Sequence, residues 1–287
     1  MSAGPAPYRT GSVTSKDGTR IGYRRLGEGP GAVLMHGAMM SAHNFMRLGT
    51  ALSRTCTVYL PDRRGRGLSG PYGPDFTLQR AAEDVEAIMD GTGARRVFAL
   101  SAGAIPVLQW ALDAPPDCRV ALYEPPLPVG GYDPAGWLDR YDREMSRGHL
   151  AAAMVTVAKG TKDSRILRIL PRTVAVPLMS IAMRAQAKQV AADEVPLVDL
   201  IPTMHHDAQL VLGAHELIRA SAAVGTDVLL LGGSRSPRYL KDALTALRAA
   251  IPRSHRVTLP GVGHLAADNG GRPDRVARLL DDYFSTR

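Results

Sequence analysis

The sequence predicts an α/β fold with a mostly parallel sheet flanked by helices, and three observations carry this prediction. Short, nearly unbroken apolar runs bounded by turn residues are typical of strands buried on both faces of a parallel sheet. Helical spacings of apolar residues separate most of these runs, and alternating strands and helices indicate a doubly wound sheet. The 287 residues, 45% of them hydrophobic, are enough to bury a sizeable core.

The expected elements follow one another along the chain. Two strands, around residues 12–15 and 21–26, form a hairpin whose turn is the Lys-Asp-Gly-Thr stretch between them. Apolar runs predict the buried strands at residues 32–35, 57–60, 97–100, 120–123, 227–231 and 256–259. Apolar residues at helical spacing predict helices at residues 42–54, 78–91, 103–114, 238–250 and 272–284.

One long interval, residues 127–225, interrupts this alternation. It has no convincing strand pattern but contains helical stretches that begin at Asp133, Gly148 and Pro177, the last of them reaching residue 194. We therefore expect a core domain of residues 1–126 and 226–287, with residues 127–225 inserted as a helical cap. Methionines in this interval are usually core filler, and in a cap they would also give a pliable lining over a site: Met145, Met154, Met179, Met183 and Met204.

Composition and charge argue against several classes of protein. The net charge of +8 comes mostly from scattered arginines, which favours a solvated surface, and the densest basic cluster, residues 62–67, lacks interleaved aromatic residues. We therefore expect no nucleic-acid partner. Cys56 and Cys118 are too few for a disulfide framework or a metal site, so two buried thiols are expected.

No secretory pattern is recognisable at the N-terminus, and no apolar run is long enough to span a bilayer. The expectation is a cytoplasmic protein without a membrane partner. A monomer is the default expectation and a homodimer the alternative.

Ser101 occupies the turn between a predicted buried strand and a predicted helix. In an open parallel sheet, ligands bind beyond the carboxyl ends of the strands, so this turn lies at the expected reaction site. Its neighbours Ala99, Ala102 and Gly103 are small, as a tight strand–turn–helix requires. The helix that follows directs the positive end of its dipole toward the same point. A serine that merely caps a helix is the alternative for this motif alone.

Other motifs end at the same edge of the predicted sheet. His36 and Gly37 close the third strand, and the backbone N–H of Ala38 could pair with that of Ala102 to form an oxyanion hole. His264 lies in a glycine-rich loop after the last strand. A lone histidine is usually a packed or surface residue, but downstream of such a serine it is interpreted as a general base.

Together these motifs resemble those of the α/β-hydrolase fold, over nearly the whole chain. They occur in the family's order: His-Gly-Ala at 36–38, a loop at 62–69 similar to D-x-R-G-x-G-x-S, Ala-Leu-Ser-Ala-Gly at 99–103 and Gly-Val-Gly-His at 261–264. The resemblance implies Ser101 as nucleophile, His264 as base, and Ala38 and Ala102 as oxyanion donors. It argues against the epoxide-hydrolase and haloalkane-dehalogenase branches, which use aspartate at the turn.

The carboxylate that should orient the base departs from the family pattern. In most members it follows the strand after the cap, but here that loop contains Arg235, and Asp227 lies at the opposite end of the strand. Glu124, at the end of the strand before the cap, is the favoured acid, with a purely structural role as the alternative. Asp268 is a weaker candidate. An Arg235 close to His264 would disfavour the imidazolium and fit a non-hydrolytic role.

Several further polar residues are candidates for the pocket rather than for catalysis. His205, His206 and Asp207 are adjacent, so they cannot all face one ion from a helix, and no metal site is expected. The candidate pocket residues are His36, Gly37, His43, Asp207 and Arg235.

The leading hypothesis is a serine hydrolase that cleaves an ester, thioester or lactone of a small, moderately apolar molecule through an acyl-enzyme. It needs a small-molecule substrate and no cofactor or metal. Two alternatives stay open: a non-hydrolytic enzyme of the same fold, such as a natural-product tailoring cyclase, lyase or acyltransferase, and a ligand-binding pseudo-hydrolase. The missing acid after the post-cap strand is the observation behind both.

Overall fold

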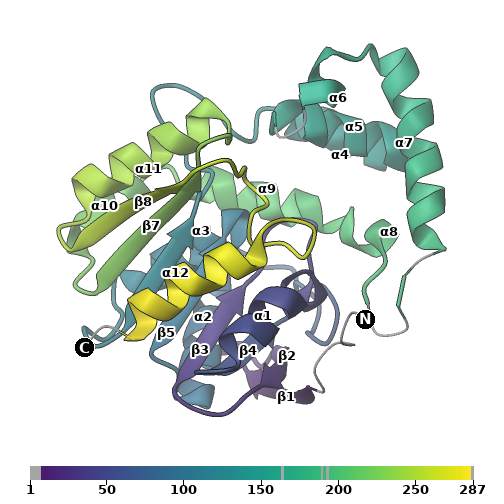
Figure 1. Cartoon of the computed structure of the whole chain (residues 1–287). Coiled ribbons are helices and arrows are strands. Elements are labelled where there is room, and N and C mark those ends of the chain that lie inside the picture. Colours follow the sequence, from purple (N-terminus) through teal and green to yellow (C-terminus); the bar gives the residue numbers. More distant parts are fainter. Residues whose placement is uncertain (1–7, 163–164, 189, 192–193, 286–287) are drawn as a thin grey trace.

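A computed structural model describes residues 8–162, 165–188, 190–191 and 194–285 of the chain. Its centre is an eight-stranded sheet in the order β1-β2-β4-β3-β5-β6-β7-β8 (Figure 1). β1 (Arg9–Thr14) pairs antiparallel with β2 (Arg20–Leu26), and β2 pairs antiparallel with β4 (Thr57–Pro61). All other neighbouring strands are parallel, which confirms the predicted α/β fold.

The predicted buried strands all lie within observed strands. These are β4 and β3 (Gly31–Met35), β5 (Arg96–Leu100), β6 (Arg119–Tyr123), β7 (Asp227–Gly233) and β8 (Ser254–Leu259). The exposed edge strand β1 was placed less well, because it starts at residue 9 rather than 12. None of its side chains is buried, so the strand has no apolar run to mark its limits.

Helices cover both faces of the sheet because alternate side chains of each strand point to opposite faces. In β5, Val97 and Ala99 pack into the core under α2, α3 and α11. Phe98 and Leu100 pack into the core under α1 and α12, which lie together in front of the sheet in Figure 1. The helices are α1 (Met46–Leu52), α2 (Leu78–Thr92), α3 (Ala104–Ala111), α11 (Arg238–Ala250) and α12 (Pro273–Ser285).

Two of the five helices predicted beside the strands differ from the observed ones by more than one residue at an end. The helix predicted at 42–54 is a short 3₁₀ turn, η1 (Ala42–Phe45), followed by α1. The helix predicted at 103–114 begins with the 3₁₀ turn η2 (Ser101–Gly103), and α3 ends at residue 111. Pro115 keeps residue 114 out of the helix, because the residue before a proline is driven out of the helical region, and ahead of it the last turn tightens to a 3₁₀-type bond from the Leu112 N–H to the Gln109 carbonyl oxygen.

Helices fill most of the segment between β6 and β7, and the described residues of its part 127–225, which we call the inserted segment, form no extended strand. Figure 1 shows α4 to α7 set off from the sheet, whereas α9 returns to it and contacts η2, α2 and α3. The elements are α4 (Leu138–Met145), α5 (Leu150–Gly160), α6 (Arg165–Ile169), α7 (Arg172–Ala187), α8 (Leu197–Leu200), α9 (Thr203–Gly213), α10 (Leu217–Ala220) and η3 (Ser221–Ala223).

The helix predicted to begin at Pro177 starts earlier, at Arg172, and carries the proline in its interior. It ends at Ala187, and residues 189, 192 and 193 of the predicted stretch lie outside the described residues. Within the described ranges, no helix combines the length and the apolar character needed to cross a membrane.

Candidate active site

Ser101 lies at a sharp turn between β5 and α3. Its φ of 55° is in the left-handed region, which costs a non-glycine residue about 1–3 kcal/mol. Small neighbours permit this turn, because a Cβ on Gly103 would lie 2.2 Å from the carbonyl oxygen of His36. A Cβ on Gly37 would likewise lie 3.3 Å from the Cβ of Ser101. The small residues therefore let the loop after β3 pack directly against the serine.

Three of the predicted residues meet in one row of hydrogen bonds. Nε2 of His264 lies 2.8 Å from Oγ of Ser101, and Nδ1 of His264 lies 2.8 Å from Oε2 of Glu124. Ser101 follows β5, Glu124 follows β6 and His264 follows β8, so all three lie beyond the carboxyl ends of parallel strands. An ionised Glu124 can only accept, so Nδ1 donates to it and Nε2 accepts from the serine hydroxyl. This tautomer can take a proton from Ser101.

The backbone of β7 fixes the Glu124 side chain. The Gly233 N–H donates to Oε1 of Glu124 at 2.6 Å, and the carboxylate is fully buried. A Cβ on Gly232 would lie 2.9 Å from the same oxygen, so this glycine leaves room for the carboxylate. The strand β7, after which the sequence resemblance placed the acid, here supplies a hydrogen-bond donor. That donor orients an acid from the neighbouring strand.

Tyr123 positions the loop that carries His264. Its hydroxyl donates to the carbonyl oxygen of Gly263 at 2.8 Å. Burial, together with the adjacent charge of Glu124, raises the pKa of this phenol, so it stays a hydrogen-bond donor at neutral pH. One strand end therefore holds the imidazole through Glu124 and the preceding carbonyl through Tyr123.

A cavity of about 340 Å³ opens onto Ser101 and His264, within the size range of small-molecule sites. Ala38 and Ala102 line it beside the serine. The rest of the wall is mostly apolar and comes from both the sheet domain and the inserted segment. Apolar side chains of the wall include Met39, Met40, Trp137, Met154, Val157, Met204 and Val211.

A model of the alpha/beta hydrolase family matches residues 32–279, which is most of the chain. The chain belongs to the alpha/beta hydrolase family. This membership confirms the resemblance found in the sequence motifs. The structure is similar to that of an alpha/beta hydrolase from Sphaerobacter thermophilus, with 27% identity and a TM-score of 0.75 over 96% of this chain and 100% of the other.

Two further relatives are more distant. The enol-lactonase from Burkholderia xenovorans has 22% identity and a TM-score of 0.66 over 98% of this chain and 100% of that one, a similarity of fold alone. A cis-3-alkyl-4-alkyloxetan-2-one decarboxylase from Shewanella oneidensis is 30% identical over 89 residues. That match covers 30% of this chain and 28% of the decarboxylase, so the chain spans less than a third of this curated relative.

Of the candidate pocket residues, Gly37 and Asp207 line the cavity of this alpha/beta hydrolase, whereas His36 does not. His36 is fully buried behind the loop. Its Nε2 accepts from the Arg63 N–H at 3.1 Å, and its Nδ1 lies 3.0 Å from the Gly37 carbonyl oxygen. Burial, and then the nearby Arg66 and Arg63, lower the pKa of His36 well below its usual value. The prediction of a pocket role for His36 is therefore wrong, and the ring is a neutral structural element.

His43 and Arg235 also lie outside the cavity wall found among the described residues, so their predicted pocket roles are wrong. His43 is half-buried in η1, where its ring meets that of Tyr8 edge-on at 6.5 Å. Arg235 is exposed, and its backbone N–H donates to the carbonyl oxygen of Val262. Arg235 thus lies at the exposed surface of the turn at the end of β7.

Asp268 lines the cavity, but other groups hold its carboxylate. Oδ2 accepts from the Asn44 side chain at 2.8 Å, and Oδ1 accepts from the Gly270 N–H at 2.8 Å. The imidazole of His264 is in contact with Glu124 instead. Asn44 also lines the cavity.

The three adjacent polar residues of α9 turn toward different partners. Nδ1 of His205 lies 2.9 Å from Oδ1 of Asp142, His206 stacks on Tyr72 at 3.7 Å, and Asp207 points into the protein. No group of metal-binding side chains is found in the part of the chain that the structure describes.

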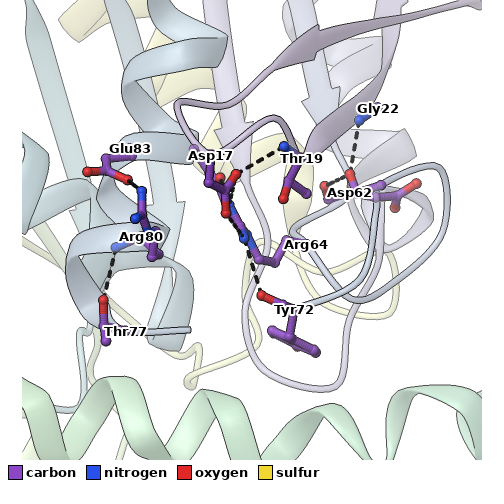
Figure 2. Close-up of polar contacts among 11 residues, drawn as sticks. Asp17, Thr19, Gly22, Asp62, Arg64, Tyr72, Thr77, Arg80 and Glu83 are labelled. Atoms are coloured by element: carbon purple, nitrogen blue, oxygen red, sulfur yellow. Dashed lines mark hydrogen bonds and ion pairs between the residues drawn. The ribbon is translucent and has the colours of Figure 1, made fainter. Parts of the chain in front are cut away.

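Sequence reasoning missed the role of the basic loop after β4. Its arginines were expected at a solvated surface, but Arg63, Arg64 and Arg66 are buried, with 7%, 2% and 4% of their surface exposed. Each pairs with a buried carboxylate: Arg63 and Arg66 with Asp207, and Arg64 with Asp84. Figure 2 shows the Arg64 side chain between Asp17 and the carbonyl oxygen of Tyr72, at 2.7 and 3.2 Å. The cluster of arginines at residues 62–67 was the signal that the sequence offered. Spacing within this stretch does not reveal the carboxylates that approach it from other elements.

Proposed function

We propose that this chain is a serine hydrolase that cleaves an ester, thioester or lactone of a small, moderately apolar molecule through an acyl-enzyme. The row of Ser101, His264 and Glu124 supports this proposal more than any other observation. Both hydrogen bonds, at 2.8 Å, have the length that activation of a serine by a histidine requires. The apolar wall of the cavity favours substrates with few polar groups.

In the proposed reaction, Oγ of Ser101 attacks the carbonyl carbon of the substrate while Nε2 of His264 takes the hydroxyl proton. The C–O or C–S bond of the tetrahedral intermediate then breaks, and His264 gives this proton to the leaving group. Water enters, loses a proton to His264 and attacks the acyl-enzyme, which releases the acid and restores Ser101. Glu124 keeps the imidazole in the required tautomer and stabilises the imidazolium.

The backbone N–H groups of Ala38 and Ala102 are the proposed oxyanion donors. Both residues line the cavity beside Ser101, and Ala102 stands at the amino end of the helical turn that leads into α3. Donors fixed before the reaction lower the barrier because charge develops on the carbonyl oxygen only in the transition state.

We also propose that residues 127–225 act as a cap on a core of residues 1–126 and 226–287. The cavity supports this division, because Trp137, Met154 and Met204 of that interval face Ser101 and His264 of the core across one space. Met154 and Met204 give the wall thioether groups that adapt to different acyl shapes.

Glu124 weighs against the non-hydrolytic and ligand-binding alternatives. Both rested on a missing acid after β7, and a carboxylate oxygen 2.8 Å from Nδ1 of His264 supplies that function from β6.

The test is hydrolysis of p-nitrophenyl esters with acyl chains of about two to twelve carbons, with γ- and δ-lactones alongside. We expect wild-type protein to hydrolyse short or medium esters and Ser101→Ala to lose about 10⁴-fold or more in kcat. Hydrolysis that survives intact in Ser101→Ala, or no turnover of any substrate by folded wild-type protein, would contradict the proposal.

A further inference from the structure

An ion cluster joins α9 of the inserted segment to the loop after β4. Nη2 of Arg63 lies 2.8 Å from Oδ1 of Asp207, and Nη2 of Arg66 lies 3.3 Å from both oxygens of the same carboxylate. In the three residues, which we call the Asp207 cluster, 7% of the side-chain surface of Arg63, 1% of that of Arg66 and 1% of that of Asp207 is exposed. Two buried guanidinium groups thus share one carboxylate as their counter-charge.

The same two arginines reach the loop that carries the proposed oxyanion donor Ala38. Nη1 of Arg63 donates to the Gly37 carbonyl oxygen at 3.4 Å, and Nη1 of Arg66 donates to the Met40 carbonyl oxygen at 3.2 Å. These two carbonyls lie on either side of Ala38 in the chain. Each arginine therefore connects Asp207 to one end of the short stretch that must place the Ala38 N–H.

This stretch needs to be held, because its backbone is strained. Met39, directly after Ala38, has a φ of 49°, a left-handed conformation that a methionine seldom adopts. The loop belongs to no helix or strand, so regular hydrogen bonding does not fix it. Oxyanion donors work only when they are aimed at the developing charge before it forms.

The surroundings keep the cluster charged and in place. Burial alone would lower the pKa of Arg66, but the charges and hydrogen bonds of Asp207 and Tyr72 together raise it, so the guanidinium stays protonated. The Arg66 Nη2 also donates to the Tyr72 hydroxyl at 2.6 Å, and Tyr72 in turn stacks on His206 of α9. Arg63 and Arg66 occupy two variable positions of the D-x-R-G-x-G-x-S loop, so the family motif itself does not account for them.

We propose that Asp207 is a positioning residue for the oxyanion hole, acting through Arg63 and Arg66 on the Gly37 and Met40 carbonyls. In this arrangement α9 completes the catalytic site, because only its docking gives the two arginines their common counter-charge. The proposal rests on the proposed function for its effect on rate, but its structural part, fixation of residues 36–41 by Asp207, stands apart from any activity.

The experiment compares wild-type protein with Asp207→Asn, Arg66→Lys and the control Glu144→Gln. Arg66 is absent from the cavity wall, so Arg66→Lys changes the cluster without touching substrate, and it replaces the two guanidinium nitrogens that reach Met40 and Asp207 by a single ammonium nitrogen. Glu144 belongs to a separate ion cluster in the inserted segment, with Arg172 and Thr156. Its variant shows what loss of such a cluster does to the inserted segment alone.

Three readouts are taken: kcat and KM on the best p-nitrophenyl ester, inhibition by a phenyl trifluoromethyl ketone, and amide hydrogen exchange of peptides covering residues 36–41. We expect kcat to fall about 10- to 100-fold in both cluster variants, with KM changed less than about threefold. The affinity for the ketone, which forms a tetrahedral adduct, should fall in parallel. Exchange at residues 36–41 should accelerate in both cluster variants and stay at the wild-type rate in Glu144→Gln.

Two results would overturn the proposal. One is a raised KM with unchanged kcat in Asp207→Asn, which would make Asp207 a substrate-binding residue. The other is unchanged exchange at residues 36–41 in both cluster variants. If wild-type protein hydrolyses nothing, the proposed function fails, and the exchange measurement still decides whether Asp207 fixes the loop. If Asp207→Asn does not fold, Arg66→Lys carries the same comparison.

Discussion

Replacing Glu124 by glutamine reverses the hydrogen bonding of His264 without changing the size of the side chain. The Gly233 N–H can only donate, so the amide oxygen of the new glutamine must take the place of Oε1. The amide NH₂ then faces Nδ1 of His264, which has to accept. The ring proton moves to Nε2, which now donates toward Ser101 and is unable to take its proton.

The cost follows from this change of tautomer. A wrong tautomer in a serine–histidine–carboxylate site lowers kcat by about 10⁴-fold. Because each tenfold is worth about 1.36 kcal/mol of barrier, the expected loss is about 5 kcal/mol. The free energy of unfolding should change by less than about 1–2 kcal/mol, since both hydrogen bonds of the side chain keep a partner.

The assay is steady-state hydrolysis of the best p-nitrophenyl ester at pH 7.5, roughly one unit above the usual histidine pKa. Glu124→Gln is compared with Asp268→Asn, which removes the rival carboxylate, and with Glu144→Gln, which makes the same change in the inserted segment. Only Glu124→Gln should lose about 10⁴-fold in kcat. The reasoning is refuted if folded Glu124→Gln stays within about tenfold of wild type, or if Asp268→Asn loses as much.

Three further predictions concern stability, each measured by urea denaturation. Gly103→Ala should lose about 1–3 kcal/mol or fail to fold, because its Cβ would meet the His36 carbonyl oxygen at 2.2 Å, whereas Gly225→Ala, with nothing within 4 Å, should be near neutral. Asp207→Ala should lose about 3–5 kcal/mol by leaving its two arginines buried without a counter-charge, and a loss below about 1 kcal/mol would contradict this. Burial holds the pKa of His36 low in the folded protein, so only the unfolded chain binds a proton at this residue as the pH falls. The free energy of unfolding should therefore drop by about 1 kcal/mol from pH 6.5 to about 5.5, and His36→Gln should lack this contribution to the pH dependence.

The fold could be predicted because local pattern and tertiary position agree in the central strands. In β5, four consecutive buried side chains alternate between two cores, so the strand reads as one apolar run. The meeting of Ser101, Glu124 and His264 follows from the same topology. Parallel strands end at one edge, so residues just beyond β5, β6 and β8 approach one another there.

Contacts between distant segments could not be predicted in the same way. The donor that orients Glu124 is Gly233, 109 residues away, and it is a backbone N–H that no side-chain pattern reveals. The carboxylate that pairs with Arg66 lies 141 residues away in α9. Scattered arginines are most often solvated, so composition alone favoured the wrong environment for this loop.

The central claim, that Ser101 is activated by His264 and Glu124, is tested most directly by labelling with a fluorophosphonate probe. Tandem mass spectrometry locates the adduct, and the rate of labelling is compared between wild-type protein and Glu124→Gln. If Glu124 orients His264, wild-type protein forms one adduct, on Ser101, rapidly, and Glu124→Gln forms it far more slowly. Folded wild-type protein without an adduct, or Glu124→Gln labelled at the wild-type rate, would contradict it.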